Sequence, residues 1–524
     1  MFVVVGSGPS GVSCAHALLD AGAEVTMLDA GFELEPDRRA RLDAVSRSGP
    51  QAGGGRHTLD FIRDGVAVAA SGIPLKLAYG SSFPYRLPAG VSIAPDGVAA
   101  KPSFARGGFS NVWGASMLPF GDEEMTGWPI KAADLEPHYR AVLRLMPFAA
   151  RRDRLEHEFP LHHDAPAALR LSAQTTAFLA DAEVAASSLE DHGIRFGASR
   201  LAVQADSGNG QGCVYCALCM YGCPYGFIYN SSDTLDALRE HPRFTYRSGI
   251  LVNQLHETRH GVLLSGLELD ARAPWSMRAE AVFLACGTVS TARVLLATLD
   301  AYERPLRAVD NCYFLLPWLR YRNRAGPDEA MHTLAQAFVE ISDPRLGPHT
   351  AHLQVYSYNE LYRQQVRNVL KALDRLFGDA VDRHVLGRML LIQGYLHSDL
   401  SAGIDLTLRR NDARTLTMSV SPNPKTRPAL SVLVSRLWAE RRSFRAVPLA
   451  PALRVGAPGR GFHTGGTFPM RERPQQFETD VWGRVDGLSR VHVVDASVFP
   501  SLPATTITLS VMANAHRIGA VAAA

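Results

Sequence analysis

Cysteine is scarce in this sequence, and so is net charge. The 524 residues include only seven cysteines, too few for the disulfide scaffolds of small secreted domains. The 54 basic and 51 acidic residues leave a formal net charge of +3, which offers little long-range attraction to nucleic acid. The long apolar stretch without charge at residues 496–515 contains Pro500, Pro503 and several threonines, which argues against a membrane-spanning helix.

We also expect no targeting segment, and internal repeats are lacking. Val3–Val5 already has the character of a strand, so we expect no signal peptide before the fold and a soluble protein located in the cytoplasm. No repeat of about 20 to 50 residues and no low-complexity tract interrupts the chain. The length exceeds what one compact core accommodates. Together these absences exclude collagenous, disordered, membrane-spanning and nucleic-acid-dedicated proteins.

The pattern of apolar residues predicts an α/β protein with a Rossmann-type nucleotide-binding domain assembled from separated pieces. Its expected elements are strands at 2–5, 24–28, 281–286 and 491–494 and helices at 12–21 and 510–521, with one more helix beginning at Thr291. Between residues 331 and 420, several runs alternate with period two and predict an antiparallel sheet, interrupted by helical residues 359–388. We therefore expect an inserted α+β substrate domain built on an antiparallel sheet.

The segment Gly6–Gly11 is a G-x-G-x-x-G motif that follows a strand and opens a helix. Gly6 permits the tight turn, Gly8 lets the backbone approach a pyrophosphate, and Gly11 allows close packing of helix and sheet. Free N–H groups at the helix N-terminus then bind the phosphates. Asp29 ends the second strand about twenty residues on, where a carboxylate binds a ribose hydroxyl. The motif alone does not separate NAD from FAD.

Three further segments favour FAD. The stretch Val491–Pro500 closely resembles the C-terminal signature of the glucose–methanol–choline (GMC) oxidoreductase family. Phe283–Thr288, followed by residues 291–293, looks like the third flavin-binding strand and turn of that family. Arg106–Gly114 resembles its Gly-Gly-x-Ser loop beside the isoalloxazine, in the form found in the pyranose-oxidase branch. Together with Gly6–Gly11, these segments form four blocks in the order of the family, and the likeness extends over about half of the chain.

The resemblance implies FAD as the cofactor. Carried over position by position, it implies contacts with FAD from Gly6, Gly8, Gly11, Asp29, Gly108, Asn111, Gly287 and Asp495, and from the backbone near Val252. Pyranose oxidases attach the flavin through a histidine in the Gly-Gly-x-Ser loop, whereas this chain has Val112 at that position. Because valine cannot form that bond, we expect FAD to be held non-covalently.

The same resemblance implies alcohol oxidation, in which a base takes the hydroxyl proton while hydride passes to flavin N5. His463 matches the family's catalytic histidine in its His-x-x-Gly-Thr-x-x-Met setting, and an imidazole suits a base near neutral pH. The second catalytic position of the family, a histidine or asparagine, falls on Thr506, beside Thr505 and Thr508. Threonine can position a hydroxyl but is no base at neutral pH. We expect His463 to act largely alone, with Thr506 and Asn111 positioning substrate and flavin.

Four of the cysteines, Cys213, Cys216, Cys219 and Cys223, form a C-x2-C-x2-C-x3-C-P run that ends on Pro224. This is the ferredoxin pattern for an iron–sulfur cluster, although the chain has a single such run. Some bacterial sugar dehydrogenases of the GMC family, which this chain resembles, carry a cluster in the flavoprotein subunit. Structural zinc and unliganded or disulfide-paired cysteines are the alternatives, but zinc sites usually separate their cysteine pairs by a longer loop.

Two features of the inserted domain bear on ligands and partners. On two alternating strands, polar and aromatic side chains share a face that either lines a sugar or polyol pocket or faces solvent. They are His352, Gln354, Tyr356 and Tyr358 on one strand and Gln393, Tyr395 and His397 on the other. Residues 361–377 predict an amphipathic helix with a basic row, either docked on its own domain or touching a membrane surface or an electron-accepting partner.

The sequence predicts five consecutive pieces. They are a first FAD-binding piece at 1–130, a substrate-domain or cap segment at 131–200, the cysteine-rich loop with a second FAD-binding piece at 201–310, the substrate domain at 311–455 and a third FAD-binding piece with the catalytic histidine at 456–524. The expected function is that of an FAD-dependent dehydrogenase that oxidises the CH–OH group of a sugar-like substrate and relays electrons through a cluster to an acceptor protein or quinone. An oxygen-using oxidase, a non-redox lyase and a non-catalytic flavoprotein subunit are the alternatives.

Overall fold

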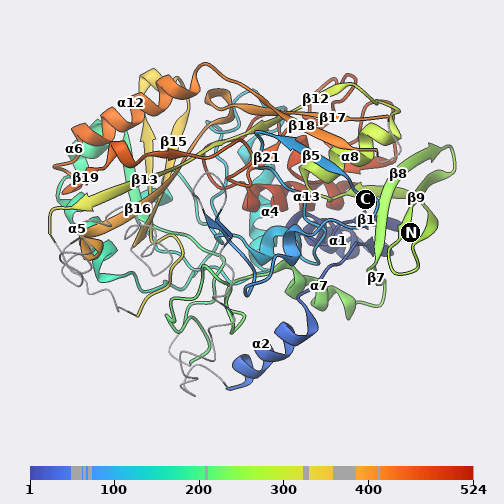
Figure 1. Ribbon diagram of the computed structural model, residues 1–524, viewed down its shortest axis with the longest axis horizontal. Helices are drawn as coiled ribbons and strands as arrows, with labels where there is room; N and C mark the ends of the chain where they lie inside the picture. Colours follow the sequence, from blue (N-terminus) through green and yellow to red (C-terminus); the bar gives the residue numbers. More distant parts are fainter. Residues whose placement is uncertain are drawn as a thin grey trace.

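A five-stranded parallel sheet organises the region of the molecule that contains both ends of the described chain (Figure 1). The computed structural model describes residues 1–48, 62, 67–68, 74–206, 210–322, 330–357, 385–410 and 414–522. The strands of the sheet, in spatial order, are β22 (Val491–Val493), β11 (Ala281–Leu284), β1 (Phe2–Val5), β2 (Val25–Leu28) and β7 (Phe244–Arg247). The four expected strands are confirmed. Their continuous apolar character reflects a parallel sheet that is covered on both faces.

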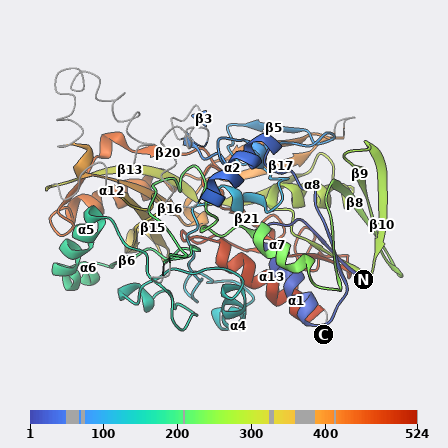
Figure 2. The same cartoon turned by 90° about the horizontal axis from the view of Figure 1, so that it is seen from below.

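Each face of the parallel sheet has its own cover. One face carries α1 (Pro9–Asp20), α7 (Ser231–Arg239) and α13 (Thr508–Ala522), with α4 (Ala132–Leu143) packed on α13; Figure 2 shows these helices side by side. The other face carries the antiparallel strands β8 (Ile250–Thr258), β9 (Gly261–Glu268) and β10 (Ala273–Ala279), together with α8 (Thr288–Thr298). Val4 and Phe283 pack against the helices α1, α7 and α13, whereas Val3 and Val282 pack against α8 and the strands β8–β10.

Three helices begin earlier than the sequence suggested. Helix α1 starts at Pro9 and not at Val12, because proline is well tolerated at the first helical position, where its missing N–H is not needed. Helix α8 starts at Thr288 and not at Thr291, directly after Gly287. Helix α13 starts at Thr508. All three therefore begin close to the turns that carry the nucleotide-binding motifs.

A second sheet lies between the parallel sheet and the inserted domain. Its order is β21 (Thr464–Gly465), β12 (Pro305–Asp310), β17 (Gly403–Leu408), β18 (Leu416–Ser421) and β5 (Ile93–Asp96). Strand β21 pairs with the end of β12, so that Thr464 lies opposite Asp310. One residue, Asn311, separates β12 from the first strand of the third sheet. The pairing thus brings the segment before Thr464 to the junction of two sheets.

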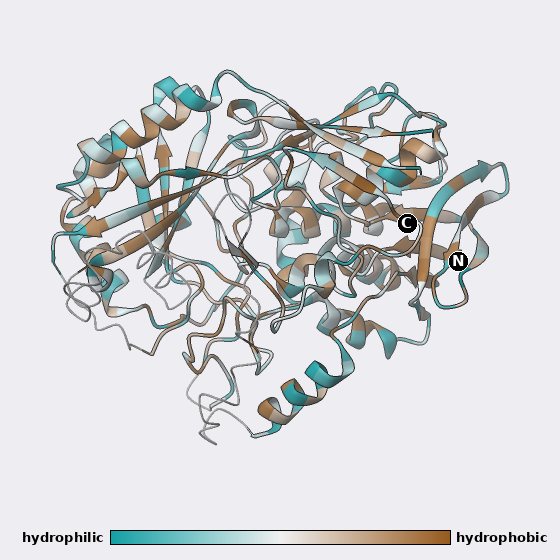
Figure 3. Cartoon of the chain, in the orientation of Figure 1, coloured by the Kyte–Doolittle hydropathy of each residue, from teal (hydrophilic) through white to brown (hydrophobic). Residues whose placement is uncertain are grey.

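The third sheet is the predicted antiparallel sheet of the inserted domain. Its strands are β19 (Ala446–Pro448), β13 (Cys312–Arg320), β16 (Met389–Leu396), β15 (Thr350–Ser357), β14 (Ala337–Ser342) and β6 (Ile194–Ala198), with β20 (Arg454–Val455) paired to β13. Phe314, Leu353 and Ile392 face helices α5 (Ala173–Val184), α6 (Ala186–Asp191) and α12 (Thr426–Ala439). Figure 3 shows hydrophobic strands beneath the hydrophilic outer side of α12. The alternate residues face the centre of the molecule.

Shorter elements complete the described chain. They are α2 (Pro36–Ser48), β3 (Ala67–Val68), β4 (Pro74–Leu75) and the 3-10 turns η3 (Phe83–Tyr85), η4 (Gly108–Asn111), η5 (Arg154–Glu156), η6 (Pro344–Leu346), η7 (Leu386–Arg388), η8 (Ser398–Leu400), η9 (Ala450–Ala452) and η10 (Ala496–Val498). Of the expected helix at 359–388, only the end with η7 is described, and the amphipathic segment 361–377 lies outside the described residues. Among the helices that are described, none is long and apolar enough to cross a membrane.

Candidate active site

The turn between β1 and α1 brings backbone segments into close contact. Gly6 has a φ of 104°, and a Cβ there would lie 2.5 Å from the carbonyl oxygen of Ala285. A Cβ on Gly11 would lie 1.9 Å from the carbonyl oxygen of Gly6. Helix α1 has neither a side-chain cap nor an acidic residue in its first turn. Its N–H groups and its dipole are therefore open to an anion.

Two buried carboxylates lie close to this turn. Asp29, just after β2, accepts a hydrogen bond from the hydroxyl of Ser7, and burial raises its pKa to about 6. Asp495 accepts from the N–H of Gly287 at 2.9 Å and from the hydroxyl of Thr291 at 2.5 Å. Burial raises the pKa of Asp495 as well. The Asp495 carboxylate thus ties the C-terminal segment to the turn between β11 and α8.

One cavity of about 380 Å³ connects these turns with the antiparallel sheet. The predicted site residues that line it are Gly6, Gly8, Asp29, Gly108, Val252, Gly287, His463, Asp495 and Thr506. Val112, which replaces the flavin-linking histidine of pyranose oxidases, also lines it. Gly11 is not among the lining residues, because it packs beneath Gly6. Segments far apart in the sequence thus border one space.

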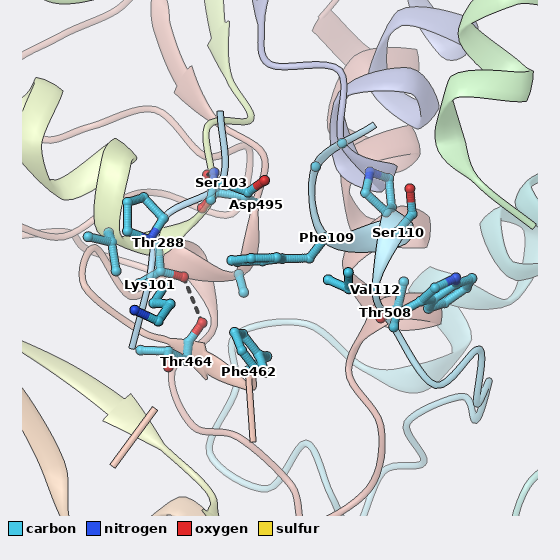
Figure 4. Close-up of a pocket in the computed structure, with 18 of the residues that line it drawn as sticks. Lys101, Ser103, Phe109, Ser110, Val112, Thr288, Phe462, Thr464, Asp495 and Thr508 are labelled. Carbon is cyan, nitrogen blue, oxygen red and sulfur yellow. Dashed lines mark hydrogen bonds between the residues drawn. The ribbon is translucent and has the colours of Figure 1, made fainter. Parts of the chain in front are cut away.

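The side chain of Asn111 forms hydrogen bonds with its own loop and with Asn230. Its amide nitrogen donates to the carbonyl oxygens of Arg106 and Gly108 at 2.9 and 2.7 Å, and its amide oxygen accepts from Asn230 at 2.9 Å. Asn111 is not among the residues that line the cavity, and its hydrogen bonds shape the Gly-Gly-x-Ser loop. The side chains of this loop that border the cavity are Phe109, Ser110, Val112 and Trp113; Figure 4 labels the first three.

Aromatic rings meet at the cavity beside this loop. The ring centroids of Phe109 and Phe462 are 5.1 Å apart (Figure 4), and Tyr85 lies 5.9 and 6.1 Å from them. Phe462 has a φ of 58°, which is an outlier for a bulky residue. Backbone strain of this kind persists where the surrounding structure imposes it, often at functional sites. Here it directly precedes His463.

His463 lies beside the junction of the second and third sheets. Its ring stacks on that of Tyr395, with centroids 5.0 Å apart, and its Nδ1 lies 3.1 Å from the amide nitrogen of Asn311. Burial, with a smaller contribution from His352, lowers the pKa of His463 to about 3. The ring is therefore neutral at neutral pH. Among the described residues that line the cavity, His463 is the single histidine.

Asn311 determines which ring nitrogen of His463 carries the proton. Its amide nitrogen donates to the carbonyl oxygen of Pro503 at 3.1 Å as well as to His463. A carbonyl can only accept, so the NH₂ side of the amide must face both groups. Nδ1 therefore accepts a hydrogen bond, and the neutral ring carries its proton on Nε2. Sequence reasoning missed Asn311, because a lone asparagine between two strands gives no local signal.

The hydroxyl groups of Thr505 and Thr506 are buried, and neither has a hydrogen-bond partner within the portion of the chain that the structure describes. Thr506 lines the cavity. A buried hydroxyl without a partner costs free energy, so an oxygen or nitrogen atom of a ligand is a natural partner for Thr506. This is the position where the sequence placed the second catalytic group.

The predicted polar face of the antiparallel sheet borders the same cavity and does not face solvent. Its members that line the cavity are Gln354, Tyr356, Gln393 and Tyr395. Behind them, Nδ1 of His352 lies 2.5 Å from a carboxylate oxygen of Glu340, and the amide of Gln354 lies 3.3 Å from Nε2 of His352. His397 is not among the lining residues, and Tyr358 lies outside the described residues.

The four clustered cysteines are free thiols that occupy one region. Burial raises the thiol pKa of Cys213 to about 12 and that of Cys216 to about 11, and the other sulfurs of the group raise both further. No three of the four sulfurs lie within 4.8 Å of one another. Ligands of one zinc ion would lie closer together, since a Zn–S bond measures about 2.3 Å.

The cysteine loop adjoins the cavity. Met220, between Cys219 and Cys223, lines it, and so does Lys76. The ammonium group of Lys76 donates to the carbonyl oxygen of Trp113 at 2.7 Å. Burial lowers the pKa of Lys76 to about 8, although Cys219 and Cys223 act in the opposite direction. Any metal group held by the cysteines would therefore lie next to the wall of the cavity.

Comparison with known proteins identifies relatives along the whole chain. A family model described as GMC oxidoreductase matches residues 449–515. The 6'''-hydroxyparomomycin C oxidase of Streptomyces lividus is 24% identical, over 98% of this chain and 89% of its own length. The paromamine 6'-oxidase of Streptomyces fradiae is 22% identical, over 98% of this chain and 90% of its own length.

A solved structure has the same fold. The crystal structure of pyridoxine 4-oxidase from Mesorbium loti matches with a TM-score of 0.60 at 14% sequence identity. The match covers 99% of this chain and 98% of that chain. The parallel sheet, the second sheet and the inserted antiparallel sheet thus belong to one known arrangement.

Proposed function

We propose, since this chain belongs to the GMC oxidoreductases, that it uses FAD to oxidise a CH–OH group of a small polyhydroxylated substrate to a carbonyl. The observation on which the proposal depends is the single cavity that joins the Gly6–Gly11 turn to His463 and Thr506. The names of the curated relatives refer to paromamine and a hydroxyparomomycin. These names support an amino sugar as the substrate class.

The nucleotide end of the cavity fits FAD. The glycine turn and the open N-terminus of α1 suit a pyrophosphate. Asp29 lines the cavity, which supports a contact with a ribose hydroxyl. Val112 at the loop supports non-covalent binding. When bound, FAD supplies the hydride acceptor for the oxidation.

Replacing Gly11 with alanine is expected to prevent stable binding of FAD. The new Cβ would push Gly6 and the start of α1 apart, since it would lie 1.9 Å from a carbonyl oxygen, and so would displace the N–H groups that face the pyrophosphate. The ratio of flavin to protein absorbance after gel filtration measures the loss. Gly127→Ala is the control for backbone strain alone, because Gly127 has a φ of 77° and a Cβ there meets nothing within 4 Å. Full FAD content in Gly11→Ala would rule out this role of the turn.

At the other end of the cavity, His463 and Thr506 are the groups that meet the reacting hydroxyl. The low pKa of His463 keeps its ring neutral and able to take a proton. For Nε2 to accept that proton, the ring proton must first be on Nδ1. Asn311 then has to turn its amide oxygen, which is buried without a partner among the described residues, toward Nδ1. Asn311 thus sets whether the ring donates or accepts at Nε2.

Replacing Asn311 with aspartate is expected to hold His463 in the accepting form. A carboxylate can only accept, so the ring proton stays on Nδ1, and the negative charge raises the pKa of the ring. In the wild type the ring is neutral above a pH of about 3, so its protonation should not slow flavin reduction between about pH 5 and 8. In Asn311→Asp, the rate should fall as the pH drops through the raised pKa, because a protonated ring cannot accept.

Anaerobic stopped-flow reduction of the flavin by substrate, measured across this pH range, tests the prediction. Asn311→Leu is the matched control, since leucine removes both hydrogen bonds without adding charge. Asn311→Leu should slow flavin reduction at every pH, and the rate should not fall further as the pH drops. Identical pH profiles for the wild type and Asn311→Asp would show that Asn311 does not govern the protonation of His463.

For the electrons we propose a relay through an iron–sulfur cluster held by Cys213, Cys216, Cys219 and Cys223. The grouping of four free thiols on one loop and the position of Met220 of that loop at the cavity wall support it. A cluster accepts electrons one at a time, which suits transfer to an external protein or quinone. The relatives are named as oxidases, and this favours a second candidate in which oxygen takes the electrons.

The deciding experiment is anaerobic mixing of the purified holoprotein with a panel of amino sugars and matched deoxy analogues. Bleaching of the flavin, with one carbonyl formed per flavin reduced, supports the proposal. A flavin that no hydroxylated compound bleaches contradicts the redox function and favours the lyase alternative. A folded protein without flavin overturns the FAD assignment.

A further inference from the structure

His332 is a buried histidine for which the described chain supplies no side-chain partner. It is 1% exposed, and neither ring nitrogen has a hydrogen bond among the described residues. Burial lowers its pKa to about 4, so the ring is neutral. A neutral imidazole has one N–H donor and one lone pair. Leaving both unpaired in the interior is costly, which indicates a partner that the described residues do not supply.

The residues on both sides of His332 bind the cysteine loop. Met331 forms a β-bridge with Cys216, and its carbonyl oxygen accepts a hydrogen bond from the loop backbone at 3.1 Å. Thr333 donates its backbone N–H to the sulfur of Cys219 at 3.4 Å. The loop and the segment 331–333 therefore form one unit, although more than a hundred residues separate them in the sequence.

The ring of His332 lies near the ring of a residue between two cysteines. Its centroid is 6.5 Å from that of Tyr215, which lies between Cys213 and Cys216. Tyr215 is itself covered by the guanidinium of Arg170, 4.3 Å from the ring centroid. The unpaired imidazole is thus adjacent to the segment that presents the first two sulfurs.

We propose that His332 belongs to the cluster site and donates a ring N–H hydrogen bond to a sulfur atom of the bound cluster. The inference rests on the proposed function, because it needs the cysteines to hold a cluster. Hydrogen bonds to the sulfurs are one of the means by which a protein sets the reduction potential of an iron–sulfur cluster. A donor at this position stabilises the extra negative charge of the reduced state and raises the potential. His332 is therefore a positioning and tuning residue for electron transfer.

The experiment compares His332→Leu, which removes the donor, with His332→Gln, which keeps an N–H group. His163→Leu is the matched control, because its Nδ1 is also buried without a partner among the described residues and its ring packs on Phe148. Full-length proteins are purified without oxygen. Iron and sulfide content, the reduction potential of the cluster by spectroelectrochemistry, and thermal unfolding before and after removal of iron by a chelator are measured for each.

His332→Leu is expected to retain iron and sulfide but to shift the potential to more negative values, and His332→Gln should restore some of the shift. His163→Leu should leave the potential unchanged. After chelation, the His332→Leu variant should unfold at a higher temperature than the wild type, because the substitution removes an unpaired polar group.

The outcomes separate this inference from the proposed function. Wild-type protein without iron and sulfide overturns the cluster, and with it the role of His332. A cluster whose potential is the same in the wild type and in His332→Leu leaves the proposed electron route intact and overturns the hydrogen bond. Loss of iron from both His332→Leu and His332→Gln, with His163→Leu intact, also overturns the hydrogen bond, because it makes His332 a ligand.

Discussion

Alanine at position 463 is expected to slow the reduction of bound FAD by substrate about 10²- to 10⁴-fold, the range that general acid–base groups contribute. His463 is the single histidine among the described residues that line the cavity. Thr506, the nearest candidate for a substitute, has a hydroxyl that cannot take up a proton at neutral pH. The residues proposed to bind FAD lie in other turns, so His463→Ala should retain its flavin.

Single-turnover reduction under anaerobic conditions measures this effect without interference from the electron acceptor. His256→Ala, at an exposed position of β8, is the control for the loss of a histidine. Added imidazole should restore some of the rate in His463→Ala, because the deletion leaves room beside Tyr395. A reduction rate within about tenfold of the wild type would remove His463 from the proton transfer.

Serine at position 216 is expected to abolish the delivery of electrons to one-electron acceptors. A serine oxygen replaces one of the four thiolate ligands that such a cluster requires, so iron and sulfide should fall to background. Reduction of FAD by substrate should continue, because Cys216 is not among the residues that line the cavity. In this variant, reduction of FAD by substrate would continue while transfer of electrons to the acceptor would stop.

Iron and sulfide analysis, stopped-flow reduction and steady-state assays with ferricyanide, a quinone and oxygen test this separation. Cys312→Ala is the control, because Cys312 is buried at the start of β13, among apolar residues. Two results together would exclude the relay: wild-type protein that contains no iron, and Cys216→Ser that turns over as fast as the wild type with every acceptor. Rapid turnover of the wild-type protein with oxygen would then identify an oxidase.

Much of the nucleotide-binding domain could be predicted because its signals are local. A strand, a glycine turn and a helix follow one another within residues 2–20, and the turn chemistry depends only on neighbouring residues. The period-two alternation of residues 350–357 and 389–396 likewise revealed both the strands and their polar face. In each case one short window contains the information that determines the structure.

The missed features depend on contacts between distant segments. The hydrogen bond from Asn230 holds the amide of Asn111 in its loop. Asn311 reaches His463 only because β12 pairs with β21. His332 lies beside the cysteines through backbone bonds of its neighbours. Pairing between segments remote in the sequence decides all three, and no single window contains both partners.

The single-residue junction at Asn311 has a mechanical consequence. Strand β12 ends at Asp310 in one sheet and β13 begins at Cys312 in another, so no flexible linker separates the two sheets at this point. A rotation of the inserted domain against the rest of the molecule would turn the Asn311 amide and, with it, the imidazole. The protein therefore cannot open widely by a hinge here without disturbing the proposed acid–base group. A substrate path that leaves His463 in place must keep these two sheets fixed relative to each other.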